Sequence, residues 1–145
     1  MIHQVMHSGN IKTGKSTVIN RDYIRLIISD TKQQGFTGLT LYLDGSFLTL
    51  YEGDIHTLEL ARQRYTNSSL YSNITTMFSR QIEKRAFSTY RLGLGRLDTS
   101  ESIESLNGCF HLTAETLDDV IPSSIPNEFK ILARTFARVN QIMAV

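Results

Sequence analysis

An alternating pattern around one turn constrains the fold of this chain more than any other feature. Residues 39–43 alternate leucines with Thr40 and Tyr42, and residues 47–51 alternate again. Between them stands the dipeptide Asp44-Gly45, which favours the tight turn of a short hairpin loop. Because successive side chains of a strand point to opposite faces of a sheet, the sequence predicts an antiparallel β-hairpin over residues 39–51.

Two helices are predicted on either side of this hairpin. Asn20 can cap the first helix, which runs to about Gln33 because apolar residues recur at intervals of three and four until Gly35 ends the pattern. Asp54 can cap the second helix. The residues that share one face of the second helix are Leu58, Ala61 and Tyr65.

Three further strands are predicted, at residues 2–7, 74–78 and 87–94. The predicted order of elements is therefore βαββαββ. Hairpin strands that alternate with crossover helices are typical of α+β domains, in which two helices cover one face of a single sheet. The sequence predicts this architecture for residues 1–97.

The C-terminal part, residues 98–145, is predicted to cover the second face of the sheet. Segments 113–121 and 127–143 have helical patterns, and Pro122 and Pro126 mark the linker between them. The later helix carries an apolar stripe made of Phe129, Leu132, Phe136, Val139 and Met143. Such a stripe indicates core packing or a surface that docks a partner or second subunit, and the two interpretations are compatible.

Composition limits the classes of function. A chain of 145 residues has room for one core and a small appendage, and 15 Lys+Arg against 14 Asp+Glu give a net charge of +1. Nucleic-acid binding usually needs a strongly basic surface. The sequence begins without a secretory leader pattern, and no apolar run approaches the roughly 20 residues of a membrane span. We therefore expect a cytoplasmic protein that binds neither nucleic acid nor membrane.

Residues 9–16 match the pattern of a phosphate-binding loop. The run reads Gly9-Asn10-Ile11-Lys12-Thr13-Gly14-Lys15-Ser16. This spacing lets backbone N–H groups surround phosphates while the lysine and the serine reach the terminal phosphates and the metal. Such a loop opens directly into a helix, whereas the expected cap Asn20 comes four residues after Ser16. We expect a flexible Gly/Lys loop, with nucleotide binding as the lesser alternative.

No residue pattern indicates catalysis. The histidines have no metal-ligand spacing with one another or with Cys109, the single cysteine. They are His3, His7, His56 and His111. No Gly-x-Ser-x-Gly motif presents a serine nucleophile. We expect a protein that is not an enzyme and holds no metal.

The hairpin and its surroundings resemble a known family. Residues 35–53 read GFTGLTLYLDGSFLTLYEG. This segment resembles the signature of BLUF domains, the sensors of blue light using FAD, which reads Gly-Ile-Thr-Gly-Leu-Leu, a dipeptide turn, Phe-x-Gln and Leu-Glu-Gly. Residues 84–93 read KRAFSTYRLG, similar to the family's Arg-x-Phe-x-x-Trp-x-Met-Gly strand. The resemblance covers residues 2–95.

The resemblance implies a ferredoxin-like sheet, a flavin ring between the two helices and a C-terminal helical cap over the opposite face. Three of the family's central flavin positions are substituted in this chain. The light-reactive tyrosine falls on His7, and the flavin-binding asparagine falls on Thr31. The glutamine that relays the light signal falls on Thr49, which lacks the amide that the photochemistry requires.

Later family positions are substituted as well, with one exception. The family's arginine on the second helix is kept as Arg64. Its acidic residue falls on Ser68, and its histidine falls on Tyr71. The signalling tryptophan and methionine positions carry Tyr90 and Leu92. The resemblance therefore implies one retained cofactor contact, for which a solvated surface arginine is the competing interpretation.

The aliphatic residues that sandwich the flavin ring in the family fall on Tyr23 and Tyr65. Each aromatic side chain buries on the order of 200 Å², so a facing pair of phenols can fill such a slot. The competing interpretation is a reshaped pocket for another small molecule, because buried phenols need hydrogen-bond partners.

We therefore expect a BLUF-like regulatory protein that carries no cofactor, has lost FAD photochemistry and acts by protein–protein contact. The expected partners are a regulatory protein and, in a homo-oligomer, further copies of this chain. Short family members without an effector enzyme act by binding a partner. Two alternatives stay open. One is an FAD-binding blue-light photoreceptor with an altered site, and the other is a nucleotide-binding protein that uses residues 9–16.

Overall fold

The computed structural model describes residues 2–12, 21–43, 45–95 and 108–143. These residues form an α+β fold with one mixed sheet and four helices. In chain order the elements are β1 (Ile2–Ile11), α1 (Arg21–Gln33), β2 (Thr37–Leu43), β3 (Ser46–Gly53), α2 (Ile55–Asn67), β4 (Tyr71–Ile82), β5 (Tyr90–Leu94), β6 (Cys109–His111), α3 (Ala114–Val120) and α4 (Asn127–Met143).

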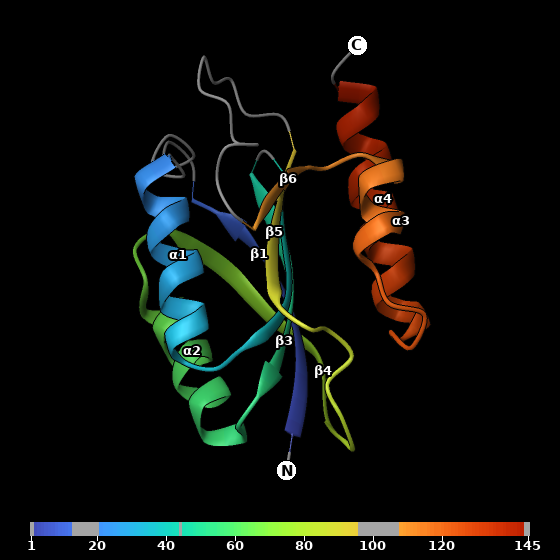
Figure 1. Cartoon of the computed structure of the whole chain (residues 1–145). Helices are drawn as coiled ribbons and strands as arrows, with labels where there is room; N and C mark the ends of the chain where they lie inside the picture. Colours follow the sequence, from blue (N-terminus) through green and yellow to red (C-terminus); the bar gives the residue numbers. More distant parts are fainter. Residues whose placement is uncertain (1, 13–20, 44, 96–107, 144–145) are drawn as a thin grey trace.

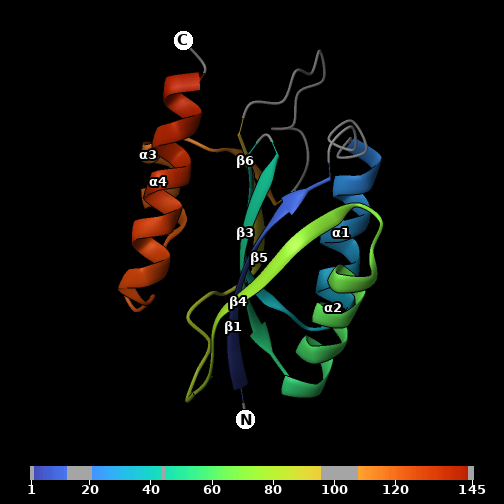
Figure 2. The same ribbon diagram turned by 180° about the vertical axis from the view of Figure 1, so that it is seen from behind.

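The sheet lies between two pairs of helices. Its strand order is β4-β1-β3-β2-β5-β6. Strand β1 pairs antiparallel with both β3 and β4, whereas β5 runs parallel to β2 and β6 parallel to β5. Figure 1 shows α1 and α2 on one side of the sheet and α3 and α4 on the other, and Figure 2 shows the same three layers from behind. The ferredoxin-like architecture and the helical cap are thus confirmed.

Local sequence explains where α2 and α3 begin. Asp54 caps α2, because its carboxylate accepts hydrogen bonds from the backbone N–H groups of His56 and Thr57. Thr113 and Thr116 form a reciprocal capping box at the start of α3. Asn20, the cap expected for the first helix, lies outside the described residues. The expected cap of the second helix is confirmed.

The β2–β3 hairpin sorts its side chains onto two faces. Residues Leu41, Leu48 and Leu50 are fully buried toward α3 and α4. Tyr42 and Tyr51 belong to the other core cluster, toward α1 and α2. Gly45 sits at the turn with φ of 81°, a backbone angle that glycine adopts without strain. The predicted alternation is therefore confirmed for these residues.

The extent of several strands differs from the prediction. Strand β1 runs to Ile11 and β4 covers Tyr71–Ile82, because the two strands pair along most of their length through two register shifts. Strand β5 begins at Tyr90 and not at residue 87. The N–H groups of Ala86 and Phe87 instead donate to the buried carboxylate of Glu52, at 2.8 and 2.9 Å. Strand β6 is not among the predicted strands.

The apolar stripe of α4 packs against the sheet. Phe129 is fully buried, and Leu132 and Phe136 pack against the same cluster. The side chains of Val139 and Met143 lie outside the described part. Core packing is therefore confirmed for the described part of the stripe, and docking of a partner or second subunit stays a prediction.

The start of the phosphate-loop motif is strand and not loop. Gly9 and Asn10 lie within β1 opposite Phe47 and Ser46 of β3. Lys12 donates its backbone N–H to the carbonyl of Leu70 at 2.8 Å. Residues 13–16 lie outside the described residues. A phosphate loop follows a parallel strand, whereas β1 has antiparallel neighbours on both sides.

Among the described helices, none is both long and apolar enough to cross a membrane.

Candidate functional site

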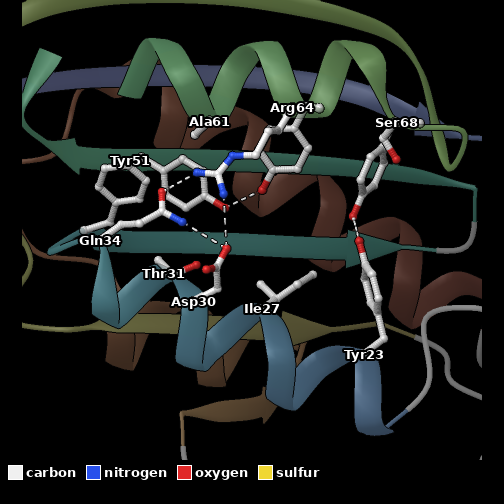
Figure 3. Close-up of a pocket in the computed structure, with 12 residues that line it drawn as sticks. Tyr23, Ile27, Asp30, Thr31, Gln34, Tyr51, Ala61, Arg64 and Ser68 are labelled. Carbon is white, nitrogen blue, oxygen red and sulfur yellow. Dashed lines mark hydrogen bonds and ion pairs between the residues drawn. The ribbon is translucent and has the colours of Figure 1, made fainter. Parts of the chain in front are cut away.

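A cavity of about 210 Å³ lies between α1 and α2, over the face of the sheet that these helices cover. Figure 3 shows the two helices on opposite sides of it, with Ile27 on α1 and Ala61 on α2. Its walls are mostly apolar or aromatic, with polar groups from both helices. The lining residues are Tyr23, Ile27, Asp30, Thr31, Gln34, Phe36, Tyr51, Ala61, Arg64, Tyr65, Ser68 and Tyr71.

Three polar side chains close one end of the cavity and tie the two helices together. Arg64 of α2 donates to Oε1 of Gln34 at 2.6 Å, and its Nη1 lies 3.5 Å from Oδ2 of Asp30. Gln34 donates in turn to Oδ2 of Asp30 at 2.9 Å. Figure 3 shows these contacts as a closed triangle. We call this group the Arg64–Gln34–Asp30 triangle. More than half of the Arg64 side chain is exposed, so the triangle lies at the surface.

All six tyrosines of the chain gather on this side of the sheet. The phenol oxygen of Tyr71 lies 2.5 Å from that of Tyr23 and 2.7 Å from that of Tyr42. The hydroxyls of Tyr51 and Tyr65 are also hydrogen-bonded to each other. The Tyr65 ring is edge-on to the Tyr71 ring, with centroids 5.2 Å apart. The predicted phenols of Tyr23 and Tyr65 therefore belong to a larger cluster.

Five of these phenols are held in the neutral form. Burial is the largest cause that raises the pKa of Tyr42, Tyr65 and Tyr90 well above the ordinary tyrosine value. The same cause raises the pKa of Tyr23 and Tyr71. These five phenols therefore keep their protons near neutral pH and remain hydrogen-bond donors.

Thr49 lies beneath the cluster in a chain of hydroxyl groups. Tyr90 donates to Oγ1 of Thr40 at 2.8 Å, and the Thr40 and Thr49 hydroxyls are 2.7 Å apart. Thr49 donates to the carbonyl of Leu39 at 3.4 Å. Thr49 is fully buried and does not line the cavity.

Thr31 differs from the other polar groups of the cavity. Only 5% of this residue is exposed, and it lines the cavity from α1 beside Asp30 (Figure 3). Its carbonyl accepts from the N–H of Phe36. Its hydroxyl has no hydrogen-bond partner among the residues that the structure describes. Buried hydroxyls are normally paired, so this one is available to a bound molecule.

His7 lies apart from the cavity, between the sheet and α2. It is 2% exposed, and its Nδ1 is 3.1 Å from Oγ1 of Thr76 on β4. Burial is the main cause that lowers the pKa of His7 from 6.5 to about 4, and the nearby Arg62 lowers it further while Glu59 opposes this effect. His7 is therefore neutral at physiological pH.

The structure brings together most of the residues that the family resemblance singled out. Those that line the cavity are Tyr23, Thr31, Arg64, Tyr65, Ser68 and Tyr71. Those that lie elsewhere are His7, Thr49, Tyr90 and Leu92. Tyr90 is buried against Tyr51, with ring centroids 5.8 Å apart, and Leu92 is core.

Several lining residues were not predicted for this site. Asp30 on α1 and Gln34 just after its end follow Tyr23 and Ile27 at intervals of three and four residues, and all four line the cavity. That spacing was available in the sequence. Tyr51 was placed only in the hairpin, although its alternation with Phe47 and Thr49 could have assigned it to this face.

The sequence and the fold differ in what they match among known proteins. No protein-family model matches the sequence, and no curated protein matches it either. BlrP1 of Klebsiella pneumoniae, solved with calcium and cyclic diGMP, superposes with a TM-score of 0.68 at 15% identity, over 94% of this chain and 34% of that chain. BlrB, described as a BLUF protein in its dark state, superposes with a TM-score of 0.54 at 14% identity, over 64% of this chain and 70% of that chain. The chain has the BLUF fold.

A bacterial light-regulated adenylyl cyclase shares the BLUF-like fold over part of its length. It superposes with a TM-score of 0.58 at 19% identity, over 72% of this chain and 31% of that chain. The chain thus spans about a third of the cyclase and of BlrP1. At these identities the likeness concerns the fold, and the BLUF resemblance in the sequence is confirmed at that level.

Proposed function

We propose that this chain is a BLUF-type signalling domain that has no flavin photochemistry and acts by binding a regulatory protein. The observation that carries the proposal is that tyrosines occupy part of the space between α1 and α2. Hydrogen bonds join Tyr65 to Tyr51 and Tyr23 to Tyr71 within that space. These contacts occupy the region that the BLUF resemblance assigns to a flavin ring.

The residues present do not fit a flavin. BlrP1 has been solved with FMN, a molecule with three fused rings and a phosphorylated side chain. The cavity here measures about 210 Å³, whereas pockets for ligands of that size usually measure roughly 300–1,000 Å³. A flavin would have to displace at least one of the paired phenols and leave its partner without a hydrogen bond.

The chemistry of β3 supports the same proposal. The family resemblance assigns the light signal to a glutamine side chain, whose amide can exchange donor and acceptor. The corresponding Thr49 is held between the Thr40 hydroxyl and the Leu39 carbonyl. The segment Ser46–Gly53 contains neither asparagine nor glutamine. Strand β3 therefore lacks a side-chain amide that could rearrange on illumination.

The family resemblance supports action through contact with another protein, because short family members without an effector enzyme act by binding a partner. BlrP1 and the light-regulated cyclase are each about three times as long as the part that matches this chain. We infer that this chain regulates a separate protein through contact, and that copies of it also associate with one another.

An absorption spectrum of the purified protein tests the absence of flavin. We expect no flavin band in the visible range and no change under blue light, even after refolding with excess FAD or FMN. A Tyr23→Ala/Tyr65→Ala double variant opens the slot and serves as the control, because flavin uptake by this variant alone would identify the two phenols as the obstacle. A flavin band in the wild type that shifts under blue light would instead establish the altered photoreceptor.

Partner binding is tested by crosslinking in cells, followed by mass spectrometry, in the dark and under blue light. We expect the same partner in equal yield under both conditions, and reconstitution with that purified partner at a defined stoichiometry. A partner whose yield depends on blue light contradicts the proposal. Analytical ultracentrifugation of the chain alone measures its self-association.

A further inference from the structure

We propose that the cavity between α1 and α2 binds a small, neutral aromatic molecule of one ring or two fused rings with one hydrogen-bonding group, of the phenol or indole class. This inference rests on the proposed function, because a bound flavin would occupy the same space. Four features of the cavity set the chemistry of the ligand. They are its volume, its walls, an unpaired hydroxyl and the charge balance at its mouth.

The volume sets the size of the ligand. A cavity of about 150 Å³ in a protein core holds one benzene molecule. The cavity here is about 210 Å³, which leaves room for one substituted ring or for two fused rings. A third fused ring with a long polar side chain exceeds it.

The walls set the shape of the ligand. Phe36, Tyr51 and Tyr65 line the cavity with aromatic rings, and Ile27 and Ala61 add aliphatic surface. The Phe36 and Tyr51 rings are stacked with centroids 5.4 Å apart, and the Tyr51 and Tyr65 rings with centroids 6.3 Å apart. Aromatic side chains favour offset-stacked and edge-on contacts with another flat ring.

The Thr31 hydroxyl supplies the polar contact. It is buried, lines the cavity and has no partner among the described residues, as stated above. A hydroxyl can both donate and accept, so it suits the O–H of a phenol or the N–H of an indole. A ligand group that pairs with it removes the cost of an unsatisfied buried hydroxyl.

The charges at the mouth favour a neutral ligand. Arg64 is the cation that lines the cavity, and it is already engaged by Asp30 and Gln34. A carboxylate placed inside would compete with Asp30 for Arg64, and without Arg64 it would be buried with no cation beside it. Burial of a charge without a partner is costly, so an anionic ring compound is disfavoured.

The experiment titrates the flavin-free protein with indole, phenol and benzoate. The chain contains no tryptophan, so the emission shift and the anisotropy of indole report its binding directly, and calorimetry follows phenol and benzoate. We expect one saturable site for indole and for phenol, and roughly tenfold weaker binding of benzoate. Absence of saturable binding of both indole and phenol would overturn the proposal. Benzoate binding as tight as that of phenol would overturn the inference that the ligand is neutral.

Two substitutions locate the site. Ala61→Leu fills the cavity and should weaken indole binding about tenfold or more, while Thr66→Leu on the exposed side of α2 should not change it. Thr31→Val keeps the shape of the side chain, removes its hydroxyl and should weaken phenol binding roughly fivefold, with recovery in Thr31→Ser. Unchanged binding in both Ala61→Leu and Thr31→Val places the ligand elsewhere and contradicts the assignment.

The two proposals fail in different ways. A protein that is purified with flavin refutes the proposed function and this inference together. A flavin-free protein that binds neither indole nor phenol refutes this inference alone. Circular dichroism of each variant shows that it is folded, and Thr31→Val remains an informative test if Ala61→Leu does not fold.

Discussion

The two faces of the sheet come from the same strands but have different chemistry. Toward α3 and α4, the hairpin presents Leu41, Leu48 and Leu50, which are fully buried among apolar side chains. Toward α1 and α2, the alternate positions present Tyr42, Thr49 and Tyr51, and none of the six tyrosines lies on the first face. On the first face the buried carboxylate of Glu52 is hydrogen-bonded to Gln4 and to the N–H groups of Ala86 and Phe87. The second face instead has hydroxyl hydrogen bonds and contains a cavity. The candidate site therefore lies on the second face alone among the described residues.

The largest expected effect comes from moving the chemistry of one face onto the other. Leu50→Thr places a hydroxyl on the apolar face and should lower the free energy of unfolding by about 3–4 kcal/mol, from lost packing and an unpaired polar group. Leu50→Val is the matched control and should cost only about 1 kcal/mol. Urea unfolding measures both. An equal loss of unfolding free energy in the two variants would mean that the α3/α4 face accommodates a hydroxyl as readily as the α1/α2 face does.

A comparable effect comes from pH, through His7. Its pKa is lowered from 6.5 to about 4 in the folded chain, so the unfolded chain binds more protons between these values. The contribution of His7 to the free energy of unfolding is therefore fully present above pH 6.5. It is lost as the pH falls toward about 4, and the total loss is about 3 kcal/mol.

Denaturant unfolding of the wild type and of His7→Gln between pH 7 and pH 4 measures this contribution. The difference between the two proteins should shrink as the pH falls, because the variant has no imidazole to protonate. A constant difference would show that His7 is not buried in its neutral form. The test concerns the α1/α2 face, because the described structure places His7 there beneath α2.

The smallest effect is expected within the hydroxyl chain. Thr49→Val removes the hydroxyl between Thr40 and the Leu39 carbonyl, and should cost about 1 kcal/mol because Tyr90 still donates to Thr40. Thr49→Ser keeps the hydroxyl and separates its effect from that of the methyl group. If Thr49→Val is as stable as the wild type, the hydrogen bonds of this face add specificity but no net stability.

Much of the fold could be predicted because its signals are local. The hairpin follows from alternation over a few residues, and the cap at Asp54 follows from one carboxylate beside two free N–H groups. The predicted face of α2 was also correct for Leu58 and Ala61, which are buried. Strand β6 has three residues and pairs with β5 after a long intervening segment. No periodicity can be recognised in so short a strand, so it could not be predicted.

The candidate site depended on contacts between distant parts of the chain. The family resemblance named Tyr23 and Tyr71 separately, yet their hydrogen bond joins residues 48 positions apart. Arg64 was recognised as a retained arginine, but its engagement by Gln34 and Asp30 depends on how closely α1 approaches α2. The shortened β5 likewise reflects Glu52, whose carboxylate reaches Ala86 and Phe87 across the sheet.

The sequence by itself determined the order of the elements and the alternation that divides the sheet into two faces. It also determined that β3 carries no side-chain amide. Each of these properties depends on residue identity and short-range spacing. Tertiary structure alone decided that all six tyrosines share one face, that His7 is neutral and buried, and that a cavity with an unpaired Thr31 hydroxyl remains between α1 and α2. These properties arise from the register of strands and the distance between helices, which bring together side chains that no local pattern connects.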